Sequence, residues 1–177
     1  MDVMREFEDW LRGMSTHALP AGAAAAALAA AMGAALVAKA TRVTLERRQP
    51  PVKTRAALQA TIQQADACRA ELYNLALADE RAYASVLAGA ERGKARREAV
   101  DVPLRIGEAC QALLAVLPDA LDACWPVVRP DLEIGSRFLQ TGRDAAILVA
   151  ATNLRDWGDE LADASLWARL EVLERGE

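Results

Sequence analysis

Asp79 is the residue of this 177-residue chain whose type and position best fit proton-transfer chemistry. Apolar side chains recur with helical spacing over residues 53–90, and at ~100° per residue Asp79 falls on the apolar side of that helix. Burial raises the pKa of a carboxyl group, so Asp79 can serve as a general acid or base near neutral pH. A structural carboxylate that pairs with an arginine or caps a neighbouring helix would give the same pattern.

Two other polar residues occupy positions from which they could act on a ligand. Asn153 lies on the apolar stripe of a helix predicted from Asp131 to about Gly158, where it either orients a ligand or water or makes a hydrogen bond between helices. His17, the single histidine, lies in a predicted loop. It either transfers protons or is simply exposed to solvent.

A long alanine-rich helix is predicted over residues 23–48, after a turn over residues 19–22, and each of its ends has groups suited to binding anions. Its first turn follows Pro20, and backbone amides at a helix N-terminus attract anions without any side chain; here they belong to Ala21, Gly22, Ala23 and Ala24. Its last turns are polar and basic, with Lys39, Arg42, Thr44, Arg47 and Arg48. The basic side chains either hold an anionic substrate or match the helix dipole in solvent.

This alanine-rich helix is predicted to lie in the middle of a bundle. Alanine is the best helix former, and its small side chain lets neighbouring helices approach closely. A membrane span is disfavoured because alanine contributes little to insertion. A signal peptide is disfavoured because the preceding residues are acidic, with Asp2, Glu6, Glu8 and Asp9.

The remaining pattern predicts more helices with short connections. We expect a short amphipathic helix over 1–14, long helices over 53–90, 94–117 and 131–158, and a final amphipathic helix over 160–177. Pro103 should kink its helix and free a carbonyl, and prolines break up residues 118–130. The predicted fold is an all-α antiparallel bundle of about five long helices in one domain, 1–177. Two helices are apolar all round, so we expect a homodimer.

Composition limits the classes of partner that the chain is expected to bind. The net charge is −4 and no basic stripe is evident, which argues against nucleic acid. Cys68, Cys110 and Cys124 are far apart, and no spacing of metal ligands links them to the single histidine. We therefore expect reduced thiols, no metal, no membrane partner and a cytoplasmic location.

Several short motifs, taken in order, resemble one known family. They are Pro20-Ala21-Gly22-Ala23-Ala24 before the alanine-rich helix, Arg42-Val43-Thr44-Leu45-Glu46-Arg47-Arg48 at its end, Leu77-Ala78-Asp79-Glu80, Val102-Pro103-Leu104, Pro130-Asp131 and Thr152-Asn153-Leu154. The chain resembles the cyclodeaminase domain of formiminotransferase-cyclodeaminase and the bacterial methenyltetrahydrofolate cyclohydrolases built on that domain.

This resemblance implies a folate one-carbon activity. The reaction would be hydrolysis of methenyltetrahydrofolate, or cyclisation of formiminotetrahydrofolate with loss of ammonia, and neither needs a cofactor. By the resemblance Asp79 transfers the proton and Asn153 orients the reacting group or water. The turn from Pro20 to Ala24 lines the pocket, and Arg42, Arg47 and Arg48 hold the glutamate tail of the folate.

The chain departs from the family pattern in that turn. Two glycines and a serine of the family are replaced by Ala21, Ala23 and Ala24, and a Cβ there restricts φ and can block the approach of a ligand. The alternative is therefore a catalytically inactive relative that acts as a ligand-binding or scaffolding helical dimer.

Overall fold

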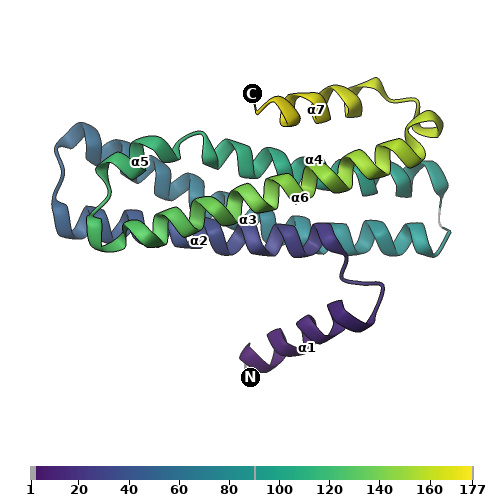
Figure 1. Cartoon of the computed structure of the whole chain (residues 1–177), viewed down its shortest axis with the longest axis horizontal. Coiled ribbons are helices and arrows are strands. Elements are labelled where there is room, and N and C mark those ends of the chain that lie inside the picture. Colours follow the sequence, from purple (N-terminus) through teal and green to yellow (C-terminus); the bar gives the residue numbers. More distant parts are fainter. Residues whose placement is uncertain (1–2, 90, 177) are drawn as a thin grey trace.

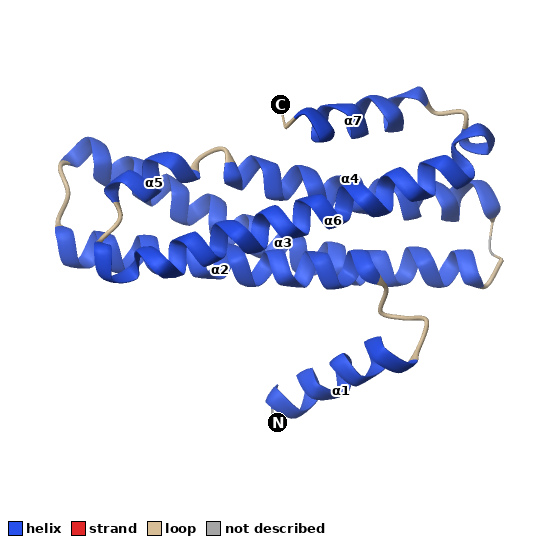
Figure 2. Ribbon diagram, in the orientation of Figure 1, coloured by secondary structure: helices blue, strands red, loops and turns tan. Residues whose placement is uncertain are grey.

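The computed structural model describes residues 3–89 and 91–176, and these form helices without a strand. Four long antiparallel helices make the bundle, as Figures 1 and 2 show: α2 (Gly22–Arg48), α3 (Val52–Leu87), α4 (Arg92–Leu114) and α6 (Arg129–Leu161). The shorter elements are α1 (Val3–Thr16), α5 (Leu117–Ala123), the 3-10 turn η1 (Pro126–Val128) and α7 (Ala164–Arg175). The predicted all-α bundle is confirmed.

Helix α2 packs along both α3 and α6, as expected for an alanine-rich central helix. Its contact with α6 is a seam of small residues. A Cβ added to Gly33 would lie 2.7 Å from the Gly135 carbonyl oxygen, and one added to Gly142 would lie 2.6 Å from the Ala30 Cβ. The two backbones therefore approach to a distance that larger side chains would not allow.

Helix α2 is also long and apolar enough to meet the length and hydropathy criteria for a membrane span. Its most apolar window has a mean hydropathy of 1.7, and 61% of that window is buried inside the bundle. A core helix of a bundle passes the same test, and the extent of burial agrees with that role.

Both ends of α6 differ from the sequence analysis. Helix α6 begins at Arg129, before the predicted start at Asp131, which instead lies in its first turn and forms an ion pair with Lys39 at 2.8 Å. Gly158 does not end α6, which continues to Leu161. Instead Gly158 lies against Trp167 of α7, which a Cβ would meet at 3.0 Å.

Helix α7 folds back over α4 and α6 and closes a second hydrophobic cluster. Leu166, Leu170 and Leu173 are its buried contributions. The two ends of α7 are also fixed by polar contacts: Asp163 caps its first turn through the Ser165 amide at 3.0 Å, and Arg143 donates to the Leu173 carbonyl at 2.7 Å.

Candidate functional site

The Asp79 carboxyl lies at the N-terminus of α2. Only 4% of the residue is exposed, and its Oδ2 accepts a hydrogen bond from the Ala24 amide at 3.0 Å. The N-cap residue of α2 is Ala21, whose side chain cannot cap. Asp79 reaches from α3 to the third helical amide, which an N-cap side chain normally bonds. The inward orientation predicted for Asp79 is confirmed, and the carboxyl caps a neighbouring helix.

The surroundings of Asp79 bring its pKa towards neutrality. Burial, the largest cause, and the charge of Glu80 together raise the pKa to about 6, against the lowering effect of the Ala24 hydrogen bond. Near pH 6 both protonation states are populated. The group can therefore accept or donate a proton at physiological pH, which is the property that general acid–base catalysis needs.

The turn before α2 adopts an ordinary backbone conformation despite its alanines. Ala21 has φ −94° and ψ 178°, which any residue can adopt. Ala23 and Ala24 are already helical, with their methyl groups buried. A Cβ added to Gly22 would meet no atom within 4 Å. The restriction of φ by these alanines therefore causes no backbone strain in this fold. There is also free space beside Gly22.

Asn153 makes a hydrogen bond between two helices. Its Nδ2 donates to the Ala99 carbonyl at 2.8 Å. In an unbroken helix that carbonyl would accept from the amide four residues later, but residue 103 is a proline and has no N–H. The carbonyl that Pro103 leaves free in its own helix thus accepts from Asn153, which satisfies a buried acceptor.

We predict that Asn153 and Pro103 are energetically coupled. Asn153→Ala leaves the Ala99 carbonyl without this partner and should destabilise the fold by about 1–3 kcal/mol. Adding Pro103→Ala supplies a backbone N–H to the same carbonyl, so the double variant should recover part of that loss. Urea unfolding of the four proteins of this cycle measures the coupling. Strictly additive effects would contradict it.

The predicted basic residues lie far from Asp79 within one chain. Arg42 is 18 residues after Ala24 in α2 and Arg47 is 23 residues after it, which places them about 27 Å and 35 Å along the helix. Arg42 is paired with Asp66, while Arg47 and Arg48 are exposed in the last turn. Within a single chain, these arginines therefore lie too far from the Asp79 carboxyl group to act with it.

Thr44 and His17 are also apart from Asp79. The Thr44 hydroxyl donates to the Ala40 carbonyl at 2.8 Å and accepts from the Trp125 amide at 3.1 Å, so it is held inside the fold, joining α2 to the segment before η1. His17 is exposed in the loop after α1, with Nδ1 3.2 Å from the Thr16 hydroxyl. Pro20 lies half-buried in the same loop.

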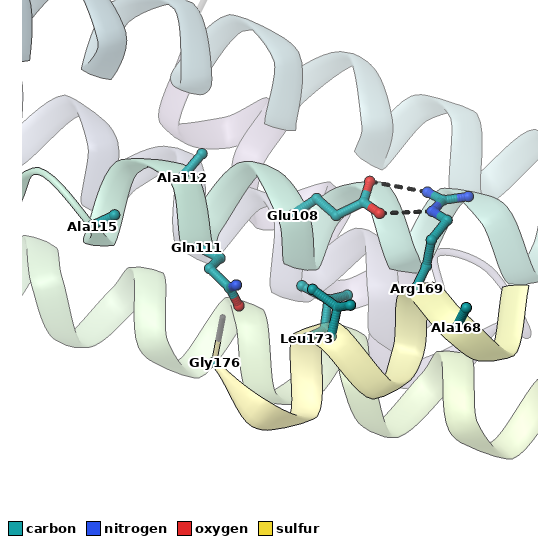
Figure 3. Close-up of a pocket in the computed structure, with 9 residues that line it drawn as sticks. Glu108, Gln111, Ala112, Ala115, Ala168, Arg169, Leu173 and Gly176 are labelled. Atoms are coloured by element: carbon teal, nitrogen blue, oxygen red, sulfur yellow. Dashed lines mark hydrogen bonds and ion pairs between the residues drawn. The ribbon is translucent and has the colours of Figure 1, made fainter. Parts of the chain in front are cut away.

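Two of the cavities along the described part of the chain involve the short helices α1 and α7. One is a groove of about 540 Å³ between α1, α2 and α3, and its lining includes Ala76 and Glu80, which are sequence neighbours of Asp79 on α3. The other, of about 530 Å³, lies between α4 and α7 (Figure 3). There Glu108 accepts two hydrogen bonds from Arg169, at 2.7 and 3.0 Å, and these contacts raise the pKa of the guanidinium. This ion pair fastens α7 to α4 and leaves no free acid or base in the pair.

The amide of Ala24 and the carbonyl of Ala99 are site components that the sequence analysis did not pair with their side chains. Both are backbone groups of alanines, so residue type carries no signal for them. The proline four residues after Ala99 could have identified that carbonyl as an unpaired acceptor. The Ala24 amide could have been identified only from the position of α2 relative to α3 along their axes.

The fold and this site define an all-α bundle protein with a buried carboxyl group at the start of an apolar central helix. The sequence profile of the formiminotransferase-cyclodeaminase family matches residues 6–172. The chain belongs to that family, as its motifs indicated.

Individual relatives agree with this assignment. The chain is 30% identical over 175 residues to the formimidoyltransferase-cyclodeaminase of Sus scrofa, covering 90% of this chain and 32% of the relative. It is 29% identical over 159 residues to the Rattus norvegicus protein, covering 81% and 29%. The chain thus spans about a third of the length of these relatives. A solved structure of formiminotetrahydrofolate cyclodeaminase from Thermotoga maritima superposes with a TM-score of 0.84 at 17% identity, covering 99% of this chain and 89% of that one, which supports the fold.

Proposed function

We propose that the protein is a folate one-carbon enzyme that cyclises formiminotetrahydrofolate with release of ammonia, or hydrolyses methenyltetrahydrofolate. Membership of the formiminotransferase-cyclodeaminase family supports the substrate class. The observation that carries the catalytic assignment is the buried Asp79 carboxyl on the Ala24 amide, with a pKa of about 6.

The proposed reaction requires a group that changes protonation state. In the cyclisation, N10 of the folate attacks the formimino carbon and loses its proton, and the departing nitrogen leaves as ammonia once it has gained one. Asp79 takes the proton from N10 and returns it to the leaving nitrogen, so the enzyme ends in its starting state. In the hydrolysis, the same carboxylate takes a proton from the water that attacks the bridging carbon and gives it to N5 as the bond between that carbon and N5 breaks; the remaining hydroxyl proton leaves to solvent as the formyl carbonyl forms. Neither route calls for a metal or an organic cofactor.

In this proposal Asn153 has a structural role, whereas Asp79 transfers protons. Asp79 lies eight residues before the end of α3, and Ala99 lies seven residues after the start of α4, so both belong to one end of the bundle. By bonding the Ala99 carbonyl, Asn153 holds α4 and α6 together at that end. Its proposed contribution is to fix the walls of the site.

We further propose a homodimer in which the basic end of one α2 lies at the start of the partner's α2. Two antiparallel helices packed about the middle of α2, roughly residue 35, would bring residues 42–48 of one copy beside residues 22–28 of the other. This arrangement would unite Arg47 and Arg48 with the partner's Asp79. These arginines would then hold the glutamate carboxylates of the folate, and the turn from Pro20 to Ala23 would line the pocket.

Turnover of the two folates tests the proposed chemistry. The purified protein is mixed with formiminotetrahydrofolate, with ammonia release followed, and separately with methenyltetrahydrofolate, with loss of its near-ultraviolet absorbance followed. Rates above those of buffer and of heat-denatured protein are expected for at least one substrate. Rates equal to both controls would favour the inactive, ligand-binding relative.

Subunit mixing tests the shared site. We predict that Asp79→Asn and the double variant Arg47→Glu/Arg48→Glu are each inactive or weak alone. After random exchange, half of the dimers are mixed and each has one intact site, so about a quarter of the wild-type rate should return. Mixing Asp79→Asn with itself is the control. No recovery, with exchange demonstrated, would place each complete site within one chain.

A further inference from the structure

Helix α1 leaves its apolar side partly uncovered. It runs beneath α2 without packing closely on the bundle (Figure 1), and Met4 is 72% exposed while Phe7 and Leu11 are each 41% exposed. A hydrogen bond at 3.4 Å from Trp10 Nε1 to Glu80 links it to α3. A helix of 14 residues is only marginally stable in water without tertiary contacts. This helix therefore needs another surface against its apolar side.

An apolar surface of the bundle lies on the same side of the molecule. Residues 22–38 of α2 carry no charge, and Met32 of this segment is 48% exposed. Exposed apolar side chains of α3 and α6 flank it on both sides. We call this surface the α2 face and define it by Leu28, Met32, Tyr73, Leu77, Ile134 and Phe138. Contiguous apolar surfaces of this kind commonly mark interfaces.

The groove beside α1 connects these two surfaces. Its lining combines Phe7 and Trp10 of α1 with Leu28 and Met32 of α2 and with Tyr73 of α3. The groove has a volume of about 540 Å³, room for side chains of another chain. Helix α1 and the part of the α2 face on α2 and α3 therefore line one mostly apolar groove, whose lining also includes Glu6, Arg69 and Glu80.

Charge favours a second copy of this chain as the occupant. Helix α1 carries Glu6, Glu8 and Asp9 against Arg5 and Arg12, so it is net acidic. An antiparallel second copy places the exposed Arg47 and Arg48 of its α2 near the start of this α2, where α1 connects. A two-fold arrangement repeats the contact, so both arms and both α2 faces become covered.

We infer that α1 is a dimerisation arm, whose apolar side packs on the α2 face of a second copy and closes the groove over it. This inference rests on the proposed homodimer and adds the segment that fastens it. Removing the arm's apolar contacts should therefore separate the subunits while the four-helix core stays folded.

Two double variants of α1 test the arm. Phe7→Glu/Leu11→Glu places two acids on the apolar side, and Arg5→Glu/Arg12→Glu places two acids on the polar side as the matched control. Light scattering over a range of concentrations should show wild-type and control dimers, and at least about a 30-fold weaker dimer for the first variant, with helical content and unfolding of the core retained. A monomeric wild type, or a first variant that dimerises as the wild type does, would overturn the inference.

Cysteine labelling gives a second measurement that does not depend on those variants. Cys68, Cys110 and Cys124 are buried, so Met4→Cys adds a thiol that a maleimide can reach in a free arm. Labelling should be slow at concentrations that favour the dimer and at least about 10-fold faster on dilution. A rapid rate at every concentration would mean that the arm is uncovered, which contradicts the inference.

Turnover measured on the same samples separates this inference from the proposed function. A wild type that is dimeric, slowly labelled and inactive would support the role of α1 in dimerisation and contradict the proposed chemistry. An active monomer would contradict the role of α1 in dimerisation and support the chemistry. Binding of the arm to phosphatidylcholine or phosphatidylglycerol vesicles in place of dimerisation would identify a lipid surface as the occupant and overturn the inference.

Discussion

Asp79→Asn is expected to lower the turnover of the folate substrate by about 10²–10⁴-fold, which is the usual contribution of a general acid or base. Asparagine has nearly the same shape, and its Oδ1 can still accept the Ala24 amide that now bonds Asp79 at 3.0 Å. The variant should therefore keep the start of α2 in place and lose only the ability to gain or release a proton. Substrate binding should change far less than turnover.

The same substitution should stabilise the protein above pH 6. Burial raises the pKa of Asp79 to about 6, above its unfolded value of about 4, so folding favours the neutral acid. That stabilising contribution is fully present below about pH 4 and is lost as the pH rises through 6, up to about 3 kcal/mol for one group. The wild type should therefore be less stable at pH 8 than at pH 5 relative to Asp79→Asn, which cannot ionise.

Thermal or urea unfolding at pH 5 and pH 8, beside the turnover assay, checks both effects. Glu71→Gln is the matched control because it removes an exposed carboxylate from the same helix, and it should change neither quantity appreciably. Full activity of Asp79→Asn would remove Asp79 from the chemistry. An equal stability difference between the two proteins at both pH values would show that the carboxyl group does not titrate as described.

Gly33→Ala is expected to destabilise the fold by about 3 kcal/mol, at the upper end of the usual cost of overpacking. The added Cβ would lie 2.7 Å from the Gly135 carbonyl oxygen and 2.8 Å from the Phe138 Cβ. These are backbone and near-backbone atoms, so α2 and α6 must move apart along the seam. Urea unfolding measures the loss.

Gly93→Ala is the matched control for this substitution. It also lies in a helix, α4, but a Cβ there would meet no atom within 4 Å. Alanine is the better helix former, so this variant should be neutral or more stable by up to about 1 kcal/mol. The two glycine-to-alanine changes should thus have opposite signs. A Gly33→Ala variant as stable as the wild type would show that the seam can relax without cost.

The periodicity and composition of the sequence were sufficient to predict the helical class and much of its organisation. Helix α2 follows from a run of strong helix formers without a proline, and Pro50 and Pro51 mark its end. The inward side of Asp79 follows from a fixed rotation of about 100° per residue. Helix ends were less certain, as Asp131 shows, because an N-cap is decided by local backbone geometry as well as by residue type.

Tertiary structure decided which groups meet. The displacement of packed helices along one another brings the Ala24 amide to Asp79 and the Ala99 carbonyl to Asn153. A sequence indicates which side of a helix a residue occupies, but not how far that helix is displaced along its neighbour. The same axial displacement of α2 and α3 separates Arg47 from Asp79, although both residues belong to motifs of one family. The sequence by itself determined the carboxyl group and the side of the helix that it occupies. Only packing removed that group from water and thereby brought its pKa close to neutral.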